Sequence, residues 1–262
     1  MIESYYKIAR TNGWDFFTGR TINYRMALAE GKPVSCPDPN PAAGLCSAGV
    51  LHASKRAEAC FQGGELPCSL FIVRGKAVCS DSTKSGFIEL EVVEELLPEN
   101  FFRWRYAEAL NPLNPLTLTP PVIDDAVLEL LTAWDSVRDS AWASARASVA
   151  DSVGASAWAR VWASVAASVG ASTRASVADS VRDSVGASVW ASVADSVRAS
   201  VGASVWAYIG YIFAPVVEAW KERYPFQSAV DLWKLGLVPS YDGSVWRLHG
   251  GPRGGILYTQ PR

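Results

Sequence analysis

The residues of this chain best suited to chemistry are the cysteines and histidines near its start. All five cysteines lie in the first third of the 262 residues, and one of the two histidines lies among them. Cys46 precedes His52 by only a short stretch, and a thiol beside an imidazole can act as an activated nucleophile. Cys46 and His52 are therefore a candidate catalytic pair, although the sequence shows no third residue that would orient the imidazole.

The same region contains a candidate metal site, formed by Cys36, Cys46, His52, Cys60 and Cys68. Structural zinc sites usually contain close C-x2-C pairs, and the spacing here is C-x9-C-x5-H-x7-C-x7-C. Buried thiols that pack as small hydrophobic groups are the better interpretation. No P-loop, dinucleotide-binding glycine motif or H-E-x-x-H motif occurs. We therefore expect neither a metal nor a cofactor.

Composition limits the partners and the compartment. The formal net charge of -2 gives no global field that would attract nucleic acid or an anionic membrane. The sequence contains no run of about 18 apolar residues, so no membrane-spanning helix is expected. The opening MIESYYKIAR lacks the pattern of an export signal. An odd number of cysteines without such a signal fits reduced thiols. We expect a cytoplasmic protein, in the host cytosol if a phage encodes it.

The region 1–110 has the pattern of an α+β domain. Residues 4–9 and 69–78 have the aromatic and β-branched content of strands, separated by glycine turns. Ile88, Leu90 and Val92 alternate with polar residues, as in a half-buried strand, with a helix as the alternative. The proline-rich start of the segment 111–133 predicts a linker, and IDDAVLELLTAW after it predicts a capping helix.

The segment 134–207 repeats every four residues. Ser occupies 17 of the 18 equivalent positions from 136 to 204, and the next position is Val 14 times. A four-residue repeat drifts by about 40° per unit around an α-helix, so one long helix would have no continuous apolar stripe. The repeat therefore favours a β-solenoid of about 16 residues per coil, with Val inside and helical caps at both ends. The alternative is a set of packed small-residue α-helices.

A longer spacing of 16 residues relates four glycines, at 154, 170, 186 and 202, and four tryptophans, at 142, 158, 190 and 206. In a solenoid these residues would stack in ladders, whereas a recent gene duplication would give the same spacing without a structural cause. The position after Val holds Arg, Trp, Ala or Gly, and such different sizes predict exposure to solvent. Its largest members are candidate binding residues because Trp and Arg dominate binding hot spots: Trp142, Trp158, Arg174, Trp190, Arg198 and Trp206.

The final segment, 208–262, is predicted to cap the array. It begins with the aromatic and apolar stretch YIGYIFAPVVEAWKERYPF. SAVDLWKLG predicts one or two helical turns ending at Gly236. Asp242-Gly243 lies between two apolar runs, which predicts a β-hairpin, and His249 at a strand end is interpreted as structural.

Two motifs resemble proteins of phage and prophage type. CSAGVLHAS (46–54), followed by FIVRG and DSTK, resembles an N-terminal domain of unknown function common in such proteins. DLWKLGLVPSYDGSVWRLHGG (231–251) resembles their C-terminal segment. The array is distantly similar to pentapeptide-repeat proteins, which form a four-sided β-helix, but it has one residue fewer per side. The resemblance implies no known activity and no catalytic residue.

These observations favour a non-enzymatic protein that presents Arg, Trp and Asp to a protein partner, or that assembles with itself. No nucleic acid and no membrane is expected as a partner. The alternative function is an enzyme, a transferase acting on nucleotides or proteins, with its site in the N-terminal region and the array as a spacer.

Overall fold

The computed structural model describes residues 3–61, 64–153 and 155–262, without the side chains of 155–157. The chain divides into two compact units, described separately below. The N-terminal unit comprises Met1–Tyr106 with Val153–Arg160, and the helical unit comprises Ala107–Ser152 with Val161–Arg262.

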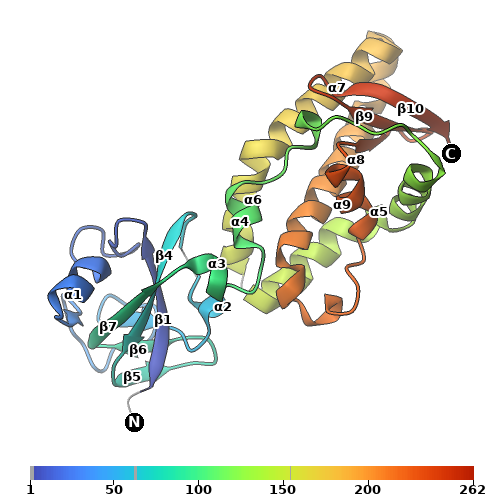
Figure 1. Ribbon diagram of the computed structural model, residues 1–262. Helices are drawn as coiled ribbons and strands as arrows, with labels where there is room; N and C mark the ends of the chain where they lie inside the picture. Colours follow the sequence, from blue (N-terminus) through green and yellow to red (C-terminus); the bar gives the residue numbers. More distant parts are fainter. Residues whose placement is uncertain (1–2, 62–63, 154) are drawn as a thin grey trace. The chain divides into compact units, whose positions relative to one another are not determined.

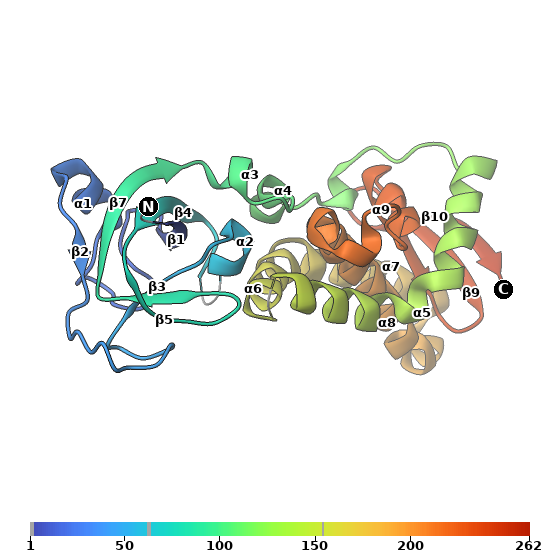
Figure 2. The same ribbon diagram turned by 90° about the horizontal axis from the view of Figure 1, so that it is seen from below.

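The N-terminal unit is built on a curled antiparallel sheet (Figure 1, Figure 2). Its four strands lie in the order β1 (Ser4–Arg10), β4 (Cys68–Arg74), β7 (Glu89–Leu96) and β2 (Val34–Ser35). The strands predicted at residues 4–9, 69–78 and 88–92 are thus present, with β4 ending before Gly75. Alternate apolar side chains of these strands point into one core, including Tyr5, Phe71 and Leu90.

Short elements complete this unit. A second sheet has the order β3 (Leu51–Ala53), β6 (Ser85–Phe87) and β5 (Ala77–Ser80). Helix α1 (Tyr24–Glu30) begins at Asn23, whose side chain accepts a hydrogen bond from the Met26 N–H, and ends at Gly31 in the left-handed conformation. The remaining short helices are α2 (Ala57–Cys60), α3 (Pro98–Phe101) and α4 (Tyr106–Leu110), the last of which includes the boundary between the units.

The predicted β-solenoid is wrong, because the repeat tract is helical. It forms the end of α5 (Asp125–Val153), then α6 (Ala155–Val165), a π-helical turn η2 (Ala166–Gly170), α7 (Ala171–Val185) and most of α8 (Ala187–Phe213). Packed α-helices were the alternative interpretation. The expected likeness to a four-sided β-helix therefore fails, and so do the expected short caps, since α5 and α8 run from the flanking segments into the tract.

Interruptions of the helix explain how a four-residue repeat can stay amphipathic. The drift of about 40° per repeat holds for an uninterrupted helix. In the described tract, the wide turn η2 and the break at Gly186 divide the repeat into shorter helices, so the drift does not accumulate along the whole tract. The position after Ser is consequently buried in most repeats, as in Val165, Val181 and Val201. The position before Ser is exposed in most of the described repeats, as in Asp179 and Asp195.

The serines are accommodated by local hydrogen bonds. Many Ser hydroxyls donate to a backbone carbonyl three or four residues earlier, at 2.7 to 3.0 Å, which satisfies the hydroxyl inside a helix. Examples are Ser136, Ser184 and Ser204. The repeated Ser is thus compatible with helix despite its modest intrinsic propensity.

The expected ladders of glycine and tryptophan do not form. Gly170 lies in the π-helical turn, Gly186 ends α7 with φ 79° and ψ 162°, and Gly202 lies inside α8. Gly154 lies outside the described residues. Because equivalent glycines have different conformations, the 16-residue spacing does not correspond to a structural repeat here.

The rest of the helical unit packs around these helices. After α8 come two 3-10 turns, η3 (Ala214–Val216) and η4 (Glu218–Trp220), then α9 (Gln227–Lys234). A three-stranded sheet follows, with β9 (Val245–Gly250) between β8 (Val238–Tyr241) and β10 (Gly255–Pro261). The helical turns ending near Gly236 and the hairpin around Asp242-Gly243 are confirmed. The linker contains one 3-10 turn, η1 (Pro115–Thr117).

Candidate functional site

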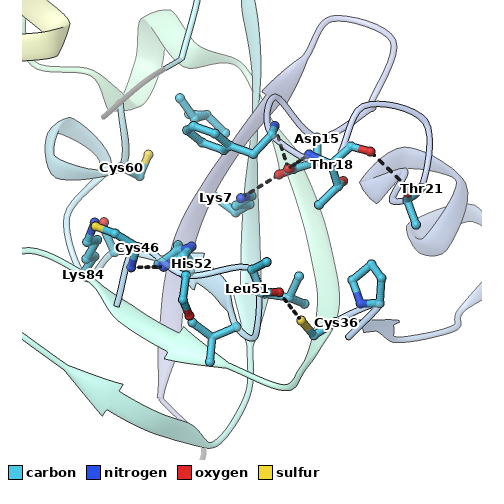
Figure 3. A pocket seen from close by; sticks show the side chains of 18 of the residues that line it. Lys7, Asp15, Thr18, Thr21, Cys36, Cys46, Leu51, His52, Cys60 and Lys84 are labelled. Carbon is cyan, nitrogen blue, oxygen red and sulfur yellow. Dashed lines mark hydrogen bonds and ion pairs between the residues drawn. The ribbon is translucent and has the colours of Figure 1, made fainter. Parts of the chain in front are cut away.

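The N-terminal unit contains a cavity of about 570 Å³ (Figure 3). Its wall is formed by β1, the loop between β1 and α1, the segment after β2, β3 with the loop before it, α2, and the turn between β5 and β6. Most of the lining is apolar, with a few polar groups at separate places. Such a cavity has the size and character of a small-molecule site.

A buried ion pair lies in the wall of the cavity. The Lys7 ammonium on β1 lies 2.7 Å from a carboxylate oxygen of Asp15, and both side chains are almost fully buried. Burial disfavours the charge on Lys7, but Tyr24 and the Asp15 carboxylate outweigh it and keep the pKa of Lys7 above its ordinary value. Burial likewise disfavours the Asp15 carboxylate, yet the Lys7 ammonium keeps the pKa of Asp15 below its usual range. Both groups are therefore charged at neutral pH.

The loop between β1 and α1 fixes Asp15 and presents hydroxyl groups to the cavity. Gly13 has φ 86°, and a Cβ there would lie 2.6 Å from the Cβ of Arg25, so only glycine fits this turn. Asp15 accepts hydrogen bonds from the backbone N–H groups of Phe17 and Thr18, at 2.9 and 3.0 Å. Among the described residues, the buried Thr18 hydroxyl has no hydrogen-bond partner. Thr18 and Thr21 of this loop line the cavity.

Cys46 lies at the rim of the cavity in an unusual conformation. It has φ 64°, the one positive φ among the described non-glycine residues, and its side chain is exposed. The Lys84 ammonium donates a hydrogen bond to the Cys46 sulfur at 2.6 Å. Left-handed backbone at a non-glycine residue costs energy and is often found at functional sites. The backbone conformation of Cys46 therefore indicates a candidate functional residue.

Lys84 is held in place by the turn between β5 and β6. A carboxylate oxygen of Asp81 accepts hydrogen bonds from the backbone N–H groups of Thr83 and Lys84, at 2.7 and 2.8 Å. The structure shows the turn and also brings Lys84 to the cavity, across 38 residues of chain from Cys46. Nothing in the sequence indicated that pairing.

His52 and Cys46 are close together, but not as a nucleophile and its base. His52 Nε2 accepts a hydrogen bond from the backbone N–H of Cys46 at 2.9 Å. Burial, followed by the charges of Lys7 and Lys84, lowers the pKa of His52 to about 4. The imidazole is therefore neutral at physiological pH, and its Nε2 supports the backbone of Cys46 rather than its thiol. His52 positions the residue that Lys84 contacts.

The candidate metal ligands do not gather around one point. Cys36, Cys46, His52 and Cys60 line the same cavity, whereas Cys68 contacts Tyr106 elsewhere in the unit. The Cys36 and Cys60 thiols donate to the carbonyls of Ala48 and Ala57. Within the described part of the chain, no three His, Cys, Asp or Glu side chains are placed to hold a metal ion.

The candidate binding residues of the tract fall into separate groups. In the helical unit, the Trp206 ring stacks on Trp162 at 5.6 Å between centroids and meets Trp142 edge-on at 6.2 Å. Trp142 and Trp162 are 46% and 37% exposed, and Trp162 is not among the binding residues predicted from the sequence. Trp190, Arg198 and Arg174 line a groove elsewhere in this unit. Trp158 is buried, so its predicted exposure is wrong.

One segment of the helical unit, Ala187–Val216, is long and apolar enough to cross a membrane by length and composition alone. Of its most apolar stretch, 67% is buried inside the structure, as in the core helix of many proteins that span no membrane.

Comparisons with known proteins give no relative from which a function could be transferred. No family model, no curated protein and no solved structure matches this chain. The candidate sites must therefore be judged by their own chemistry.

Proposed function

We propose that the N-terminal unit is an enzyme domain that binds a small organic substrate in its cavity and uses the Cys46 thiol as a nucleophile. The observation that carries this proposal is the Cys46 sulfur, held at the rim of a cavity of about 570 Å³ with the Lys84 ammonium 2.6 Å away. This is the alternative function of the sequence analysis. The tract is helical rather than a solenoid, so recognition by its tryptophans is kept below as the second candidate function.

The pairing with Lys84 has a chemical consequence. The nucleophilic form of cysteine is the thiolate, and a neighbouring ammonium stabilises that anion. In the proposed step, the Cys46 sulfur forms a bond to an electrophilic centre of the substrate. The leaving group departs with the electron pair of the broken bond, and the Lys84 ammonium donates a proton to that leaving group. The reaction class is group transfer through a covalent enzyme intermediate.

The opposite part of the cavity is suited to bind the rest of the substrate. Thr18, Thr21 and Phe17, which is 71% exposed, line this part of the cavity. Leu51 and Ala53 of β3 are among the apolar residues of the lining. These features favour a substrate with an apolar or planar body and a polar group, consistent with a nucleotide-like molecule as the proposed class.

The proposal is tested by measuring alkylation of all five cysteines with iodoacetamide, followed by peptide mass spectrometry. Cys46 should react fastest, and Lys84→Met should slow its alkylation about tenfold, because the thiolate loses its counter-charge. Lys76→Met, which removes an exposed lysine of the turn between β4 and β5, is the matched control and should leave the rate unchanged. Equal rates for Cys46 in the Lys84→Met and wild-type proteins would refute the role of Lys84.

A second candidate function is protein recognition by the helical unit. The observation that favours it is the partly exposed cluster of Trp142, Trp162 and Trp206, since exposed tryptophans often form the centre of an interface. The partner would be another protein or a second copy of the chain. Self-assembly predicts a dimer in sedimentation equilibrium that Trp142→Ala with Trp162→Ala weakens, whereas Val189→Ala, at another exposed position of the tract, does not.

A further inference from the structure

A groove of about 390 Å³ lies between α7 and α8 in the helical unit. Its long side chains are Arg174 and Arg182 from α7, and Trp190 and Arg198 from α8. All four occupy the variable position of the tetrapeptide, the one after the buried Val. The groove is distant in sequence from the cavity of the N-terminal unit, and the inference below does not rest on the proposed enzyme function.

The packing of the two helices explains why the variable positions meet. Gly186 joins α7 to α8, and α8 runs back along α7 with Val177 and Val181 packed against Val197 and Val201. In a helix, the residue after each buried Val is turned about 100° from it. The variable positions therefore lie at the edge of the buried seam on both helices, where they face one another.

The size of the side chains then creates a hollow. Ala178 lies one repeat after Arg174 and one repeat before Arg182, and it lines the groove with them. A small residue between two long ones leaves space that neither guanidinium fills. The sequence of the variable position thus determines both the shape and the charge of this groove.

One arginine of the groove differs from the other two in its ion pairs. The groove is lined by three arginines and one carboxylate, that of Asp179. Arg182 lies 2.8 Å from Asp179 and 3.9 Å from Asp183, and Arg198 lies 3.4 Å from the exposed Asp195. Arg174 is half-buried, and no carboxylate in the described part of the chain forms an ion pair with it. A partly desolvated guanidinium without a carboxylate partner favours an anion from solution.

Trp190 adds a flat apolar wall. Its indole ring is half-buried, and the Arg198 guanidinium lies over it with 5.6 Å between the guanidinium carbon and the ring centroid. Arginine and tryptophan together form a surface on which a planar ring can stack. Guanidinium groups at the same site are suited to bind phosphate oxygens through paired hydrogen bonds.

From this arrangement we infer that the groove binds a small organic anion that has a planar ring and a phosphate group, with Arg174 on the phosphate and Trp190 on the ring. The groove is a binding site in this proposal, and no reaction takes place there. Because Arg, Trp, Ala and Gly alternate at the variable position, other lengths or sequences of the tract would change the ligand.

The test uses the full chain with 15N-labelled tryptophan side chains and adenosine monophosphate as the probe. The indole N–H resonance of Trp190, assigned with Trp190→Phe, should shift in a saturable manner. Adenosine lacks the phosphate and inorganic phosphate lacks the ring, so each alone should bind at least about tenfold more weakly. Equal binding of adenosine and adenosine monophosphate would overturn the role of Arg174.

Two substitutions separate this groove from other sites. Arg174→Met should weaken binding about tenfold, as expected for the loss of one charge-assisted contact. Arg146→Met is the matched control, because Arg146 occupies the same position of an earlier repeat in α5, outside the groove, and should leave binding unchanged. Circular dichroism checks that both variants are folded. No shift of the Trp190 resonance at millimolar probe, or equal effects of the two substitutions, would overturn the inference.

Discussion

At the scale of single residues, several charged and polar groups of this protein are buried or strained, and their partners come from other parts of the fold. Lys7 and Asp15 are buried as a pair, and Cys46 has a left-handed backbone with Lys84 beside its sulfur. His249 is another example, in the helical unit. It is fully buried, with Nε2 2.8 Å from the Ser240 hydroxyl and Nδ1 2.8 Å from the Gly254 carbonyl. Its interpretation as a structural residue agrees with these bonds.

Burial of His249 predicts a loss of stability in acid. Burial is the main cause that lowers the pKa of His249 to about 4, from 6.5. Between these values the unfolded chain binds a proton that the folded chain does not. The free energy of unfolding should therefore be fully retained above pH 6.5 and should fall by up to about 3 kcal/mol as the pH drops towards 4.

Two measurements check this prediction. Urea unfolding followed by circular dichroism at pH 7 and pH 4.5 gives the change in free energy of unfolding. An NMR titration gives the pKa of each histidine, and His52 should also remain neutral near pH 5. A His249 signal that titrates near pH 6.5 would contradict the buried, neutral imidazole.

At the scale of elements, the repeat tract shows how one sequence unit can have different structural roles. Equivalent glycines end a helix at Gly186 and lie within one at Gly202. Equivalent valines are buried at Val181 and 48% exposed at Val189. The structural role of each repeated residue therefore depends on where the helices break, and not on its position in the repeat.

The two glycines should respond to alanine with opposite signs. Gly186 has φ 79° and ψ 162°, a conformation essentially confined to glycine, so Gly186→Ala should destabilise the helical unit by about 1–3 kcal/mol. At Gly202, no neighbouring atom lies within 4 Å of an added Cβ, so Gly202→Ala should stabilise α8 by about 0.5–1 kcal/mol. Denaturant unfolding measures both. Changes of the same sign would show that the helix does not break at Gly186.

The valines provide a second comparison. Val181 belongs to the core between α7 and α8, and Val181→Ala should lower the free energy of unfolding by roughly 2 kcal/mol. Val189→Ala, at the same position of the repeat, should change it by less than about 0.5 kcal/mol. The difference between the two variants, measured in urea, tests the helical phase. Similar losses at both positions would contradict it.

Sequence reasoning identified several elements because their signals are local. Strand content at residues 4–9, the glycine after α9 and the Asp242-Gly243 turn each depend on a few adjacent residues. The β-solenoid prediction is wrong because the drift of the repeat excludes only one continuous amphipathic helix, whereas the tract forms several. No residue pattern in the sequence predicts the π-helical turn at 166–170 that interrupts the helices of the tract.

At the scale of the whole molecule, the same limit applies to the candidate site. Cys46 and His52 were a candidate pair whose spacing does not decide proximity, and the structure brings them together through the loop that leads into β3. Lys7, Asp15 and Lys84 were missed as site residues because the fold brings them together from separate elements. No motif marks them, and their roles follow only from the curled sheet around the cavity.

We propose that the cavity of the N-terminal unit holds a small substrate for Cys46. The most direct measurement incubates the full chain with a small-molecule cell extract, followed by gel filtration and mass spectrometry under non-denaturing conditions. We predict that Cys46→Ser retains one small organic molecule per chain, because it binds substrate without the thiol reaction. Addition of Ala48→Trp, at an exposed position of the cavity lining, should abolish retention. No molecule retained by Cys46→Ser, or equal retention when Ala48→Trp is added, would contradict the account.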